Sequence, residues 1–371
     1  MNKIILSILV SLIFISCYAQ ELKTYNLDEA LELVDKSEVL ILDLQDEYFE
    51  EIPKSILQFK NLEQLFIGGN SSLTKFPDFL GEFKELWHLH IGPNDYTELP
   101  ENFGDLKKLS RLKISNNSIQ KLPKSFINLP SLKKLYLINN KISELPEDLG
   151  KLISLEQIII QKNNESKLSG LPKSIGKLSN LRLLALKRCY LTEVPKEIGN
   201  LVNLEVLELK NNRLNELPDI SKLSKLTHLR LFGNKLKELP FSIRYCKELI
   251  EIDASWNDLL SISSSLSQLE KLTVLKLNNN DIKILPNNIG QLSSLEILYL
   301  GANFNATIAN ENIADLINLK ELYLSQNRLS KLPSSYTKLT NLKILDLSEN
   351  NIIKSDLEKI KKSFPNCEVY E

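Results

Sequence analysis

The sequence contains few of the residues on which catalysis and metal binding usually depend. Its 371 residues include three His, four Cys, two Trp and one Met. The phosphate-loop, zinc-protease, CxxC and nucleophile-elbow patterns (GxxxxGKS/T, HExxH, CxxC and GxSxG) are all absent from it. His88 and His90 have the spacing of two metal ligands on one strand, but no third ligand is evident. We therefore expect no enzymatic activity, no cofactor and no metal site.

An excess of charge of either sign is also missing. Lys and Arg total 46 and Asp and Glu total 47, which gives a net charge of -1. Nucleic-acid-binding domains and polybasic membrane-surface proteins usually carry a basic excess. The balance therefore predicts that the chain binds no nucleic acid and makes no electrostatic contact with a membrane.

Long apolar runs are confined to the N-terminus. Lys3 precedes an apolar run over residues 4–15, and small residues follow before Gln20. This pattern predicts a secretory signal peptide over residues 1–19. Residues 14–17 also resemble a bacterial lipobox, which would make Cys17 a lipid-modified N-terminus and the only membrane attachment, and a buried first segment of the fold is the third interpretation. The first two interpretations predict an exported protein, either secreted or attached to the cell surface.

One pattern, LxxLxLxxN, recurs through the rest of the chain at steps of 22 to 26 residues. Its ninth position is occupied by Asn70, Asn94, Asn117, Asn140, Asn163, Cys189, Asn212, Asn234, Asn257, Asn280, Asn303, Asn327 and Asn350. A degenerate first copy over residues 39–47 brings the total to 14 units. A second pattern, LPxxIGxL, separates the copies, for example at residues 171–178, 194–201 and 285–292.

These two patterns resemble the leucine-rich-repeat family in its 23-residue LPxxIGxLxxL variety, which includes exported bacterial proteins. The resemblance covers residues 39–369 and implies an α/β solenoid, a curved horseshoe. A parallel β-sheet would line its concave face, with short helical, 3-10 or irregular segments on its convex face. The alternation xLxLx itself predicts short strands with one buried face. Stacked turns would bury the Leu side chains in one continuous core.

Open ends of a solenoid need caps, so the expected organisation has four parts. These are a signal peptide (1–19), an N-terminal helical cap (20–38), repeats (39–350) and a C-terminal cap (351–371). Asn26 is expected to cap a helix that buries Leu27, Ala30, Leu31 and Val34. Ser355 is expected to cap a helix with Leu357, Ile360 and Phe364, before a last strand in which Cys367 takes a Leu position.

The remaining signature residues have expected structural roles. The Pro of LPxxIG cannot extend the sheet and should lead into the convex segment, whereas its Gly should serve a tight bend or a positive φ. The ninth-position amides should bond backbone groups of adjacent turns in a ladder. That ladder comprises Asn117, Asn140, Asn163, Cys189, Asn212 and Asn234, with the Cys189 thiol as a weak donor. Cys189, Cys246 and Cys367 should be buried, reduced and unpaired.

Positions 3, 5 and 7 of each copy should project from the concave sheet and form the binding face. Arg111 and Lys134 make a basic zone there, Ala185 and Val206 add to an apolar middle zone, and Glu251, Asp253, Lys276, Tyr299 and Tyr323 follow. The predicted partner-binding residues are Phe66, Trp87, His88, His90, Lys113, Tyr136, Ile138, Ile159, Leu183, Lys187, Lys210, Arg230 and Phe232.

An apolar zone with a charged rim is typical of a protein interface. We therefore predict a monomer that binds a protein partner, with Tyr136, Ile159, Leu183 and Phe232 as anchors. The same zone is also compatible with the strand preference of β-branched residues alone. Glycan binding through Trp87, Tyr299 and Tyr323 and a self-associating surface protein are the alternatives.

Overall fold

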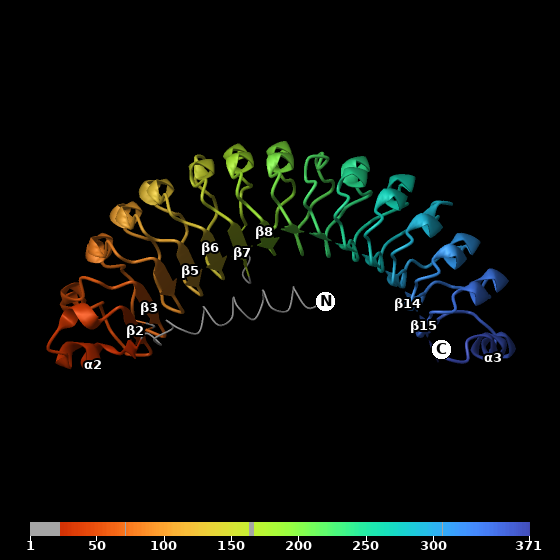
Figure 1. Ribbon diagram of the computed structural model, residues 1–371, viewed down its shortest axis with the longest axis horizontal. Helices are drawn as coiled ribbons and strands as arrows, with labels where there is room; N and C mark the ends of the chain where they lie inside the picture. Colours follow the sequence, from red (N-terminus) through yellow and green to blue (C-terminus); the bar gives the residue numbers. More distant parts are fainter. Residues whose placement is uncertain (1–22, 71, 163–166, 306) are drawn as a thin grey trace, which may run out of the picture.

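The computed structural model describes residues 23–70, 72–162, 167–305 and 307–371. The chain winds into an open arc with β-strands along its inner edge and short helices along its outer edge (Figure 1). Helix α2 lies at one end of the arc and helix α3 at the other. The predicted signal peptide, Cys17 and the ladder position Asn163 lie outside the described residues.

The inner edge is a single 16-stranded sheet in which every strand pairs in parallel with the next along the chain. The strands are β1 (Thr24–Tyr25), β2 (Ile41–Gln45), β3 (Gln64–Gly68), β4 (His88–Ile91), β5 (Arg111–Ser115), β6 (Lys134–Ile138), β7 (Gln157–Gln161), β8 (Leu183–Lys187), β9 (Val206–Glu208), β10 (His228–Arg230), β11 (Glu251–Asp253), β12 (Val274–Lys276), β13 (Ile297–Tyr299), β14 (Glu321–Tyr323), β15 (Ile344–Asp346) and β16 (Glu368–Tyr370). This confirms the predicted solenoid, and β2 to β15 are the strands of the 14 units.

The core is one continuous cluster of apolar side chains between the sheet and the convex segments. Leu residues at the first, fourth and sixth repeat positions supply most of it; Leu132, Leu135 and Leu137 are at most 1% exposed. Burying one Leu side chain is worth roughly 1.5–3 kcal/mol, but a single turn covers only one side of it. Each turn is therefore stable because its neighbours complete the burial.

Short 3-10 helices form most of the convex face, as the LPxxIG pattern predicted. They are η1 (Lys36–Glu38), η2 (Lys54–Gln58), η3 (Asp78–Glu82), η4 (Glu101–Asp105), η5 (Lys124–Asn128), η6 (Leu149–Lys151), η7 (Lys173–Lys177), η8 (Lys196–Asn200), η9 (Phe241–Tyr245), η10 (Ser264–Gln268), η11 (Ile289–Gln291), η12 (Glu311–Asp315) and η13 (Ser334–Lys338). Proline stands directly before η2 to η5, η7 to η9 and η13. Its fixed φ and missing N–H suit that position, where no ladder bond is needed.

The glycine of LPxxIG has a different role from the one predicted. None of these glycines has a positive φ. A Cβ on Gly104 would lie 2.1 Å from the carbonyl oxygen of Ser125, and one on Gly150 would lie 2.1 Å from that of Ser174. Glycine is needed here because the backbones of successive convex turns approach too closely for any side chain.

Positive φ angles occur instead one position before the ladder residue. Asn116, Asn139, Arg188, Asn211, Trp256, Asn279, Ala302, Gln326 and Glu349 all have φ between 53° and 56°. Asn tolerates this left-handed conformation better than most residues. The frequent Asn-Asn pairs of the repeat therefore join a left-handed turn residue to a ladder residue.

The asparagine ladder is present as predicted at the described positions. Asn212 Nδ2 donates to the carbonyls of Leu186 (2.7 Å) and Leu209 (2.9 Å), while its Oδ1 accepts from the N–H of Cys189 (3.1 Å). Asn117, Asn140 and Asn234 likewise donate to a carbonyl of the preceding turn. Each amide thus satisfies backbone groups that would otherwise be buried without partners.

Cysteine fits the ladder and the core at two of the three described positions. The Cys189 thiol lies 3.4 Å from the carbonyl of Lys187 and 3.6 Å from that of Ile160, which confirms its role as a weak donor. Burial raises the pKa of the Cys189 and Cys246 thiols to about 12. All three cysteines are unpaired, but Cys367 is partly exposed, so its predicted burial is wrong.

The N-terminal cap contains a strand as well as the predicted helix. In β1, Tyr25 pairs with Leu42 of β2. Asn26 caps helix α2 (Leu27–Glu32) by accepting from the N–H of Glu29 at 2.9 Å. Val34 lies beyond the end of this short helix and is fully exposed, so its predicted place on the buried face is wrong.

The C-terminal cap differs from the prediction in two details. Helix α3 spans Lys354–Ser363, so Ser355 lies inside it and Ile353 takes the cap position. In β16 it is Val369, not Cys367, that pairs with Leu345. A shift of two residues keeps the same side chains on the same face, so the alternation of the sequence is compatible with both registers. None of the helices in the described part of the chain has the length and apolarity needed to cross a membrane.

Candidate functional site on the concave face

The parallel register arranges the concave side chains in rows that run along the solenoid. His88, Arg111, Lys134 and Gln157 follow one another in the row of third positions. His90, Lys113, Tyr136 and Ile159 follow one another in the row of fifth positions. Neighbours in a row are about 4.8 Å apart, so the face is a regular lattice on which each side chain has a defined place.

An aromatic cluster lies at β3 and β4. The Phe66 ring makes edge contacts with His88 (5.2 Å between centroids) and His90 (6.1 Å). Trp87 stacks on His88 at 5.5 Å and donates its indole N–H to Glu63 at 3.1 Å. Burial, with the nearby charges of Arg111, His90 and Lys113, lowers the pKa of His88 to about 4, so its imidazole is neutral at pH 7.

A group of cations follows on β5 and β6, and we call it the basic cluster. Its members are Arg111, Lys113 and Lys134. Arg111 pairs in register with Lys134, and Lys113 lies next to His90 on the other side. None of the three forms an ion pair with any residue in the described part of the chain. Their charges therefore remain available to a ligand.

Apolar side chains on β6 to β8 lie next to the basic cluster, and we call Tyr136, Ile138, Ile159 and Leu183 the apolar patch. Tyr136 and Ile159 are direct neighbours across the two strands. All four side chains are half-buried. Ala185, which the sequence placed in this zone, is 2% exposed and offers almost no surface. Val206 of β9 is half-buried and pairs in register with Leu183, so the apolar surface continues one strand beyond the four patch residues.

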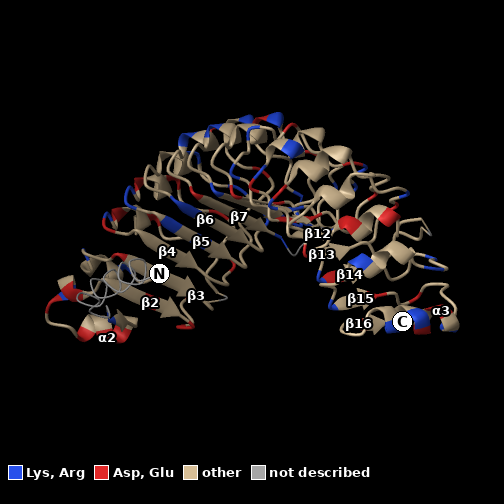
Figure 2. Cartoon of the chain, turned by 45° about the vertical axis from the view of Figure 1, so that its right-hand side comes forward, with Lys and Arg blue, Asp and Glu red and all other residues tan. Residues whose placement is uncertain are grey.

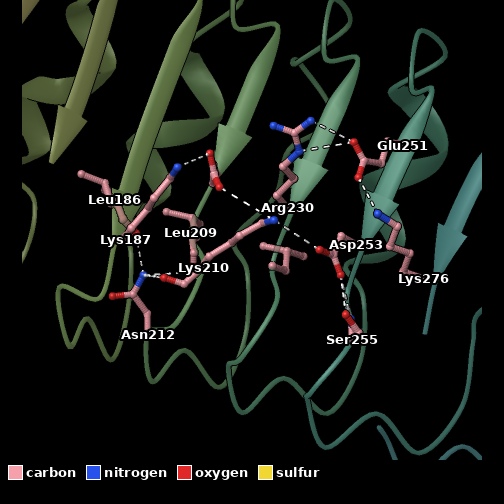
Figure 3. Close-up of polar contacts among 12 residues, drawn as sticks. Leu186, Lys187, Leu209, Lys210, Asn212, Arg230, Glu251, Asp253, Ser255 and Lys276 are labelled. Carbon is pink, nitrogen blue, oxygen red and sulfur yellow. Dashed lines mark hydrogen bonds and ion pairs between the residues drawn. The ribbon is translucent and has the colours of Figure 1, made fainter. Parts of the chain in front are cut away.

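Beyond the patch, a chain of ion pairs crosses β8 to β11 (Figure 3). Glu208 lies 3.1 Å from Lys187 and 3.9 Å from Lys210, measured between carboxylate oxygen and ammonium nitrogen. Lys210 also lies 3.4 Å from Asp253, whose carboxylate accepts from the hydroxyl of Ser255. The side chains of Glu208 and Asp253 are only 11% and 7% exposed, so these pairs are better shielded from solvent than surface pairs.

A second group of charges lies on β10 to β12. Glu251 accepts from Arg230 at 2.9 Å and from Lys276 at 3.3 Å. Burial opposes ionisation of the Glu251 carboxyl, but the two cations outweigh it and lower its pKa. Lys187, Lys210 and Arg230 were predicted as a basic rim for a partner. Their charges are instead largely neutralised within the chain.

The remaining predicted binding residues lie apart from the apolar patch. Phe232 contacts Trp256 at 6.4 Å between ring centroids, and the ion pairs of β8 to β11 separate it from Leu183. Tyr299 and Tyr323 stack on each other at 4.2 Å with ring planes 2° apart. They belong to β13 and β14, whereas Trp87 precedes β4, so these three aromatic residues do not form a common platform for a glycan.

Glu208 was not among the predicted site residues, although it joins Lys187 to Lys210. The signal was present in the sequence, because Glu208 is the fifth position of a copy whose neighbours carry cations at concave positions. The pairing of Glu208 with Lys187 follows from the rows of the sheet and not from the sequence of a single copy. Among the described residues, no three His, Cys, Asp or Glu side chains gather closely enough to hold a metal ion.

The fold and its repeated ladder define the class of protein, and comparison with known families agrees. Family models described as a leucine-rich repeat region match residues 78–171 and 160–252, and one for leucine-rich repeats in two copies matches residues 317–362. A leucine-rich-repeat protein of Leptospira interrogans is 31% identical, with a TM-score of 0.77 over 94% of this chain and 100% of that one. The chain belongs to the leucine-rich-repeat family.

More distant structures share the fold. An internalin of Listeria monocytogenes is 21% identical, with a TM-score of 0.70 over 86% of this chain and 89% of that chain. Toll of Drosophila, solved in complex with Spatzle, is 23% identical, with a TM-score of 0.68 over 86% and 48% of the two chains. An adenylate cyclase of Schizosaccharomyces pombe is 32% identical over 130 residues, which are 35% of this chain and 6% of the cyclase. The chain thus matches a small part of this curated relative. Proteins of this fold commonly mediate protein–protein interactions.

Proposed function

We propose that this chain is an exported, monomeric binding protein without catalytic activity, and that its concave face takes a protein partner through the apolar patch. The observation that carries the proposal is the patch itself. Tyr136, Ile138, Ile159 and Leu183 form a contiguous, half-buried apolar surface on a face whose other side chains are mostly charged or polar. Aromatic and aliphatic residues within a polar surround are the common anatomy of a protein interface.

The rigidity of the sheet supports this role. The patch is held on consecutive strands whose buried side chains are packed in the core. Its residues therefore lose little conformational freedom on binding, which favours affinity. Toll, which shares the fold, is a protein solved with a protein bound to it.

The test is a change of the patch that leaves the core intact. Ile159→Asp with Leu183→Asp should abolish capture of the partner from extracts and culture medium of the native host, detected by mass spectrometry of the bound fraction. The matched control is Ile153→Asp with Val202→Asp. These side chains are 58% and 44% exposed and lie outside the strands. Capture that survives the patch change, or is lost equally in the control, contradicts the proposal.

Export rests on the N-terminal sequence and has its own measurement. The intact mass of protein recovered from the native host should correspond to a chain that begins at Gln20. A mass that includes an acylated Cys17 would support the lipoprotein alternative. A mass of the full sequence from Met1 would contradict export through a cleaved signal.

A further inference from the structure

The concave face carries two kinds of cation. Lys187, Lys210, Arg230 and Lys276 each have an acidic partner at 3.9 Å or less. The three members of the basic cluster have none among the described residues, although the same lattice of positions holds them. The paired cations are neutralised, whereas the basic cluster is not. The local potential is therefore positive at β5 and β6.

The charges of the basic cluster also act on the neighbouring imidazoles. Burial is the main reason why the pKa of His90 is lowered, and the charge of Lys113 lowers it further. His88 is affected in the same direction by Arg111 and Lys113. Asp43 on β2 acts on His90 in the opposite direction, but it forms no ion pair with the basic cluster. An anion placed over β5 and β6 would therefore meet three cations that form no ion pair with a carboxylate of the described residues.

The basic cluster and the apolar patch are continuous. Lys113 of β5 pairs in register with Tyr136 of β6, and Tyr136 pairs with Ile159 of β7. A ligand lying along the row of fifth positions therefore passes from cations to apolar side chains within one strand spacing. Such a ligand needs a negative group and an apolar group close together in the same segment.

We infer that the partner presents an extended, acidic peptide segment, with its carboxylates over the basic cluster and apolar side chains on the apolar patch. This inference rests on the proposed function and specifies the chemistry of the partner. The cations on β5 are two strand spacings from Ile159 on β7 and three from Leu183 on β8, or about 10 to 15 Å. An extended peptide advances about 3.3 Å per residue. An acidic residue of the peptide over β5 and an apolar residue over Ile159 or Leu183 are therefore about three to five positions apart in the peptide.

An acidic peptide fits both the basic cluster and the apolar patch better than the other anionic polymers do. A nucleic acid offers regularly spaced phosphates and is usually bound by a broader basic surface than three side chains on a chain of net charge -1. An acidic polysaccharide offers carboxylates or sulfates but no aliphatic side chain for Ile159 and Leu183. A peptide can supply both the carboxylates for the basic cluster and the apolar side chains for the apolar patch.

The experiment uses the full chain and a random peptide library displayed on phage. Selected sequences should carry Asp or Glu about three to five positions from Leu, Ile, Phe or Tyr, as the strand spacing requires. A selected peptide is then synthesised with a fluorescent label, and its binding is measured by anisotropy. Arg111→Glu with Lys134→Glu should weaken binding about tenfold or more at low salt, because attraction becomes repulsion.

The matched control is Lys124→Glu with Lys173→Glu. It makes the same change in net charge at exposed convex positions, and neither lysine forms an ion pair with another described residue. It should leave the affinity within about twofold, because distant surface charges are screened. Circular dichroism of both variants checks that the fold is kept.

Three outcomes overturn the inference. One is selection of sequences without acidic residues, and another is an equal loss of affinity in the convex control. The third is binding of heparin, an acidic polysaccharide, that outcompetes the peptide and is insensitive to Ile159→Asp with Leu183→Asp. Peptides that lack acidic residues but are lost on the patch change would leave the proposed function standing and remove only the acidic partner.

Discussion

Removal of one ladder amide tests the most regular feature of the fold. Asn280 is 4% exposed, and its Nδ2 donates to the carbonyls of Ala254 and Leu277, each at 3.0 Å. Its Oδ1 accepts from the N–H of Leu259 at 3.0 Å. The change Asn280→Ala leaves the Leu259 N–H without this partner and removes one bond from each carbonyl, although Asn257 still donates to Ala254 and Asn303 to Leu277.

The size of the effect follows from the number of bonds lost. A buried polar group left without a partner costs about 1–3 kcal/mol, and partial relaxation of the loop recovers some of it. One orphaned N–H and two weakened carbonyls should therefore lower the free energy of unfolding by about 2–4 kcal/mol. The neighbouring Asn278 makes no side-chain hydrogen bond with the described residues, so Asn278→Ala should cost under about 1 kcal/mol.

Guanidinium chloride denaturation measures both changes. Trp256 precedes the ladder residue of the adjacent turn and reports unfolding there, provided that Trp87 is replaced by Phe in all variants. The slope of free energy against denaturant should stay constant if the solenoid still unfolds as one unit. A loss below about 1 kcal/mol for Asn280→Ala, with an unchanged slope, would show that water replaces the amide and would refute the reasoning.

Four further changes have expected outcomes, all measurable by chemical denaturation. Since the pKa of His88 is about 4 in the folded chain against an ordinary 6.5, the unfolded chain binds the extra proton between these values. Stability should fall by about 1–2 kcal/mol from this group as pH drops from 6.5 to 4, and His88→Gln should remove that contribution and leave the one from His90, whose pKa is also lowered. Gly104→Ala should cost about 2–3 kcal/mol, because its Cβ would strike the backbone of Ser125. Asn279→Val should cost about 1–2 kcal/mol, because a β-branched residue is strained at φ 55°. Glu208→Gln should cost about 1–2 kcal/mol, because the half-buried Lys187 loses its acidic partner and Lys210 keeps only Asp253.

Three of these changes have a counterpart that should do little. Asn279→Gly keeps the left-handed conformation, and Ala is tolerated at exposed convex positions away from the glycine contacts. Glu248→Gln removes an exposed pair with Lys271 and should cost under about 0.5 kcal/mol. A loss of stability between pH 6.5 and 4 that is as large in His88→Gln as in the parent chain would contradict the role of His88. Equal costs for Glu208→Gln and Glu248→Gln would contradict the importance of burial for the ion pairs.

The sequence predicted most of the scaffold because the core depends on residue type at fixed spacing. Leu at three positions and Asn at the ninth each have one physical role, and the structure confirms both at the described positions. The left-handed residue before the ladder was not predicted, because that position holds Asn, Gly, Arg, Trp, Ala, Gln and Glu. Backbone geometry there is imposed by the turn and not by a residue preference.

Apart from Val34 and Ser355 in the caps, the main predictions that failed concern relations between turns. The glycine of LPxxIG is required by the next turn's backbone, which no local pattern encodes. The register of β16 was misplaced by two residues because both registers bury the same face. The cations of the predicted rim lie on the concave face, but except for the contact of Lys210 with Glu208 in its own copy, their partners come from other copies 21 to 43 residues away. Their neutralisation therefore depends on the lattice of the sheet.

The separation between scaffold and surface explains how one repeat can carry different binding properties. Core and ladder positions are held by packing, so the third, fifth and seventh positions can vary with little effect on the fold. Lys113 and Lys276 both occupy fifth positions, yet Lys276 has Glu251 at 3.3 Å and Lys113 has no acidic partner among the described residues. The difference lies in the neighbouring copy, not in the lysine. Charge compensation between adjacent copies therefore distinguishes cations that stabilise the sheet from cations that remain available to a partner.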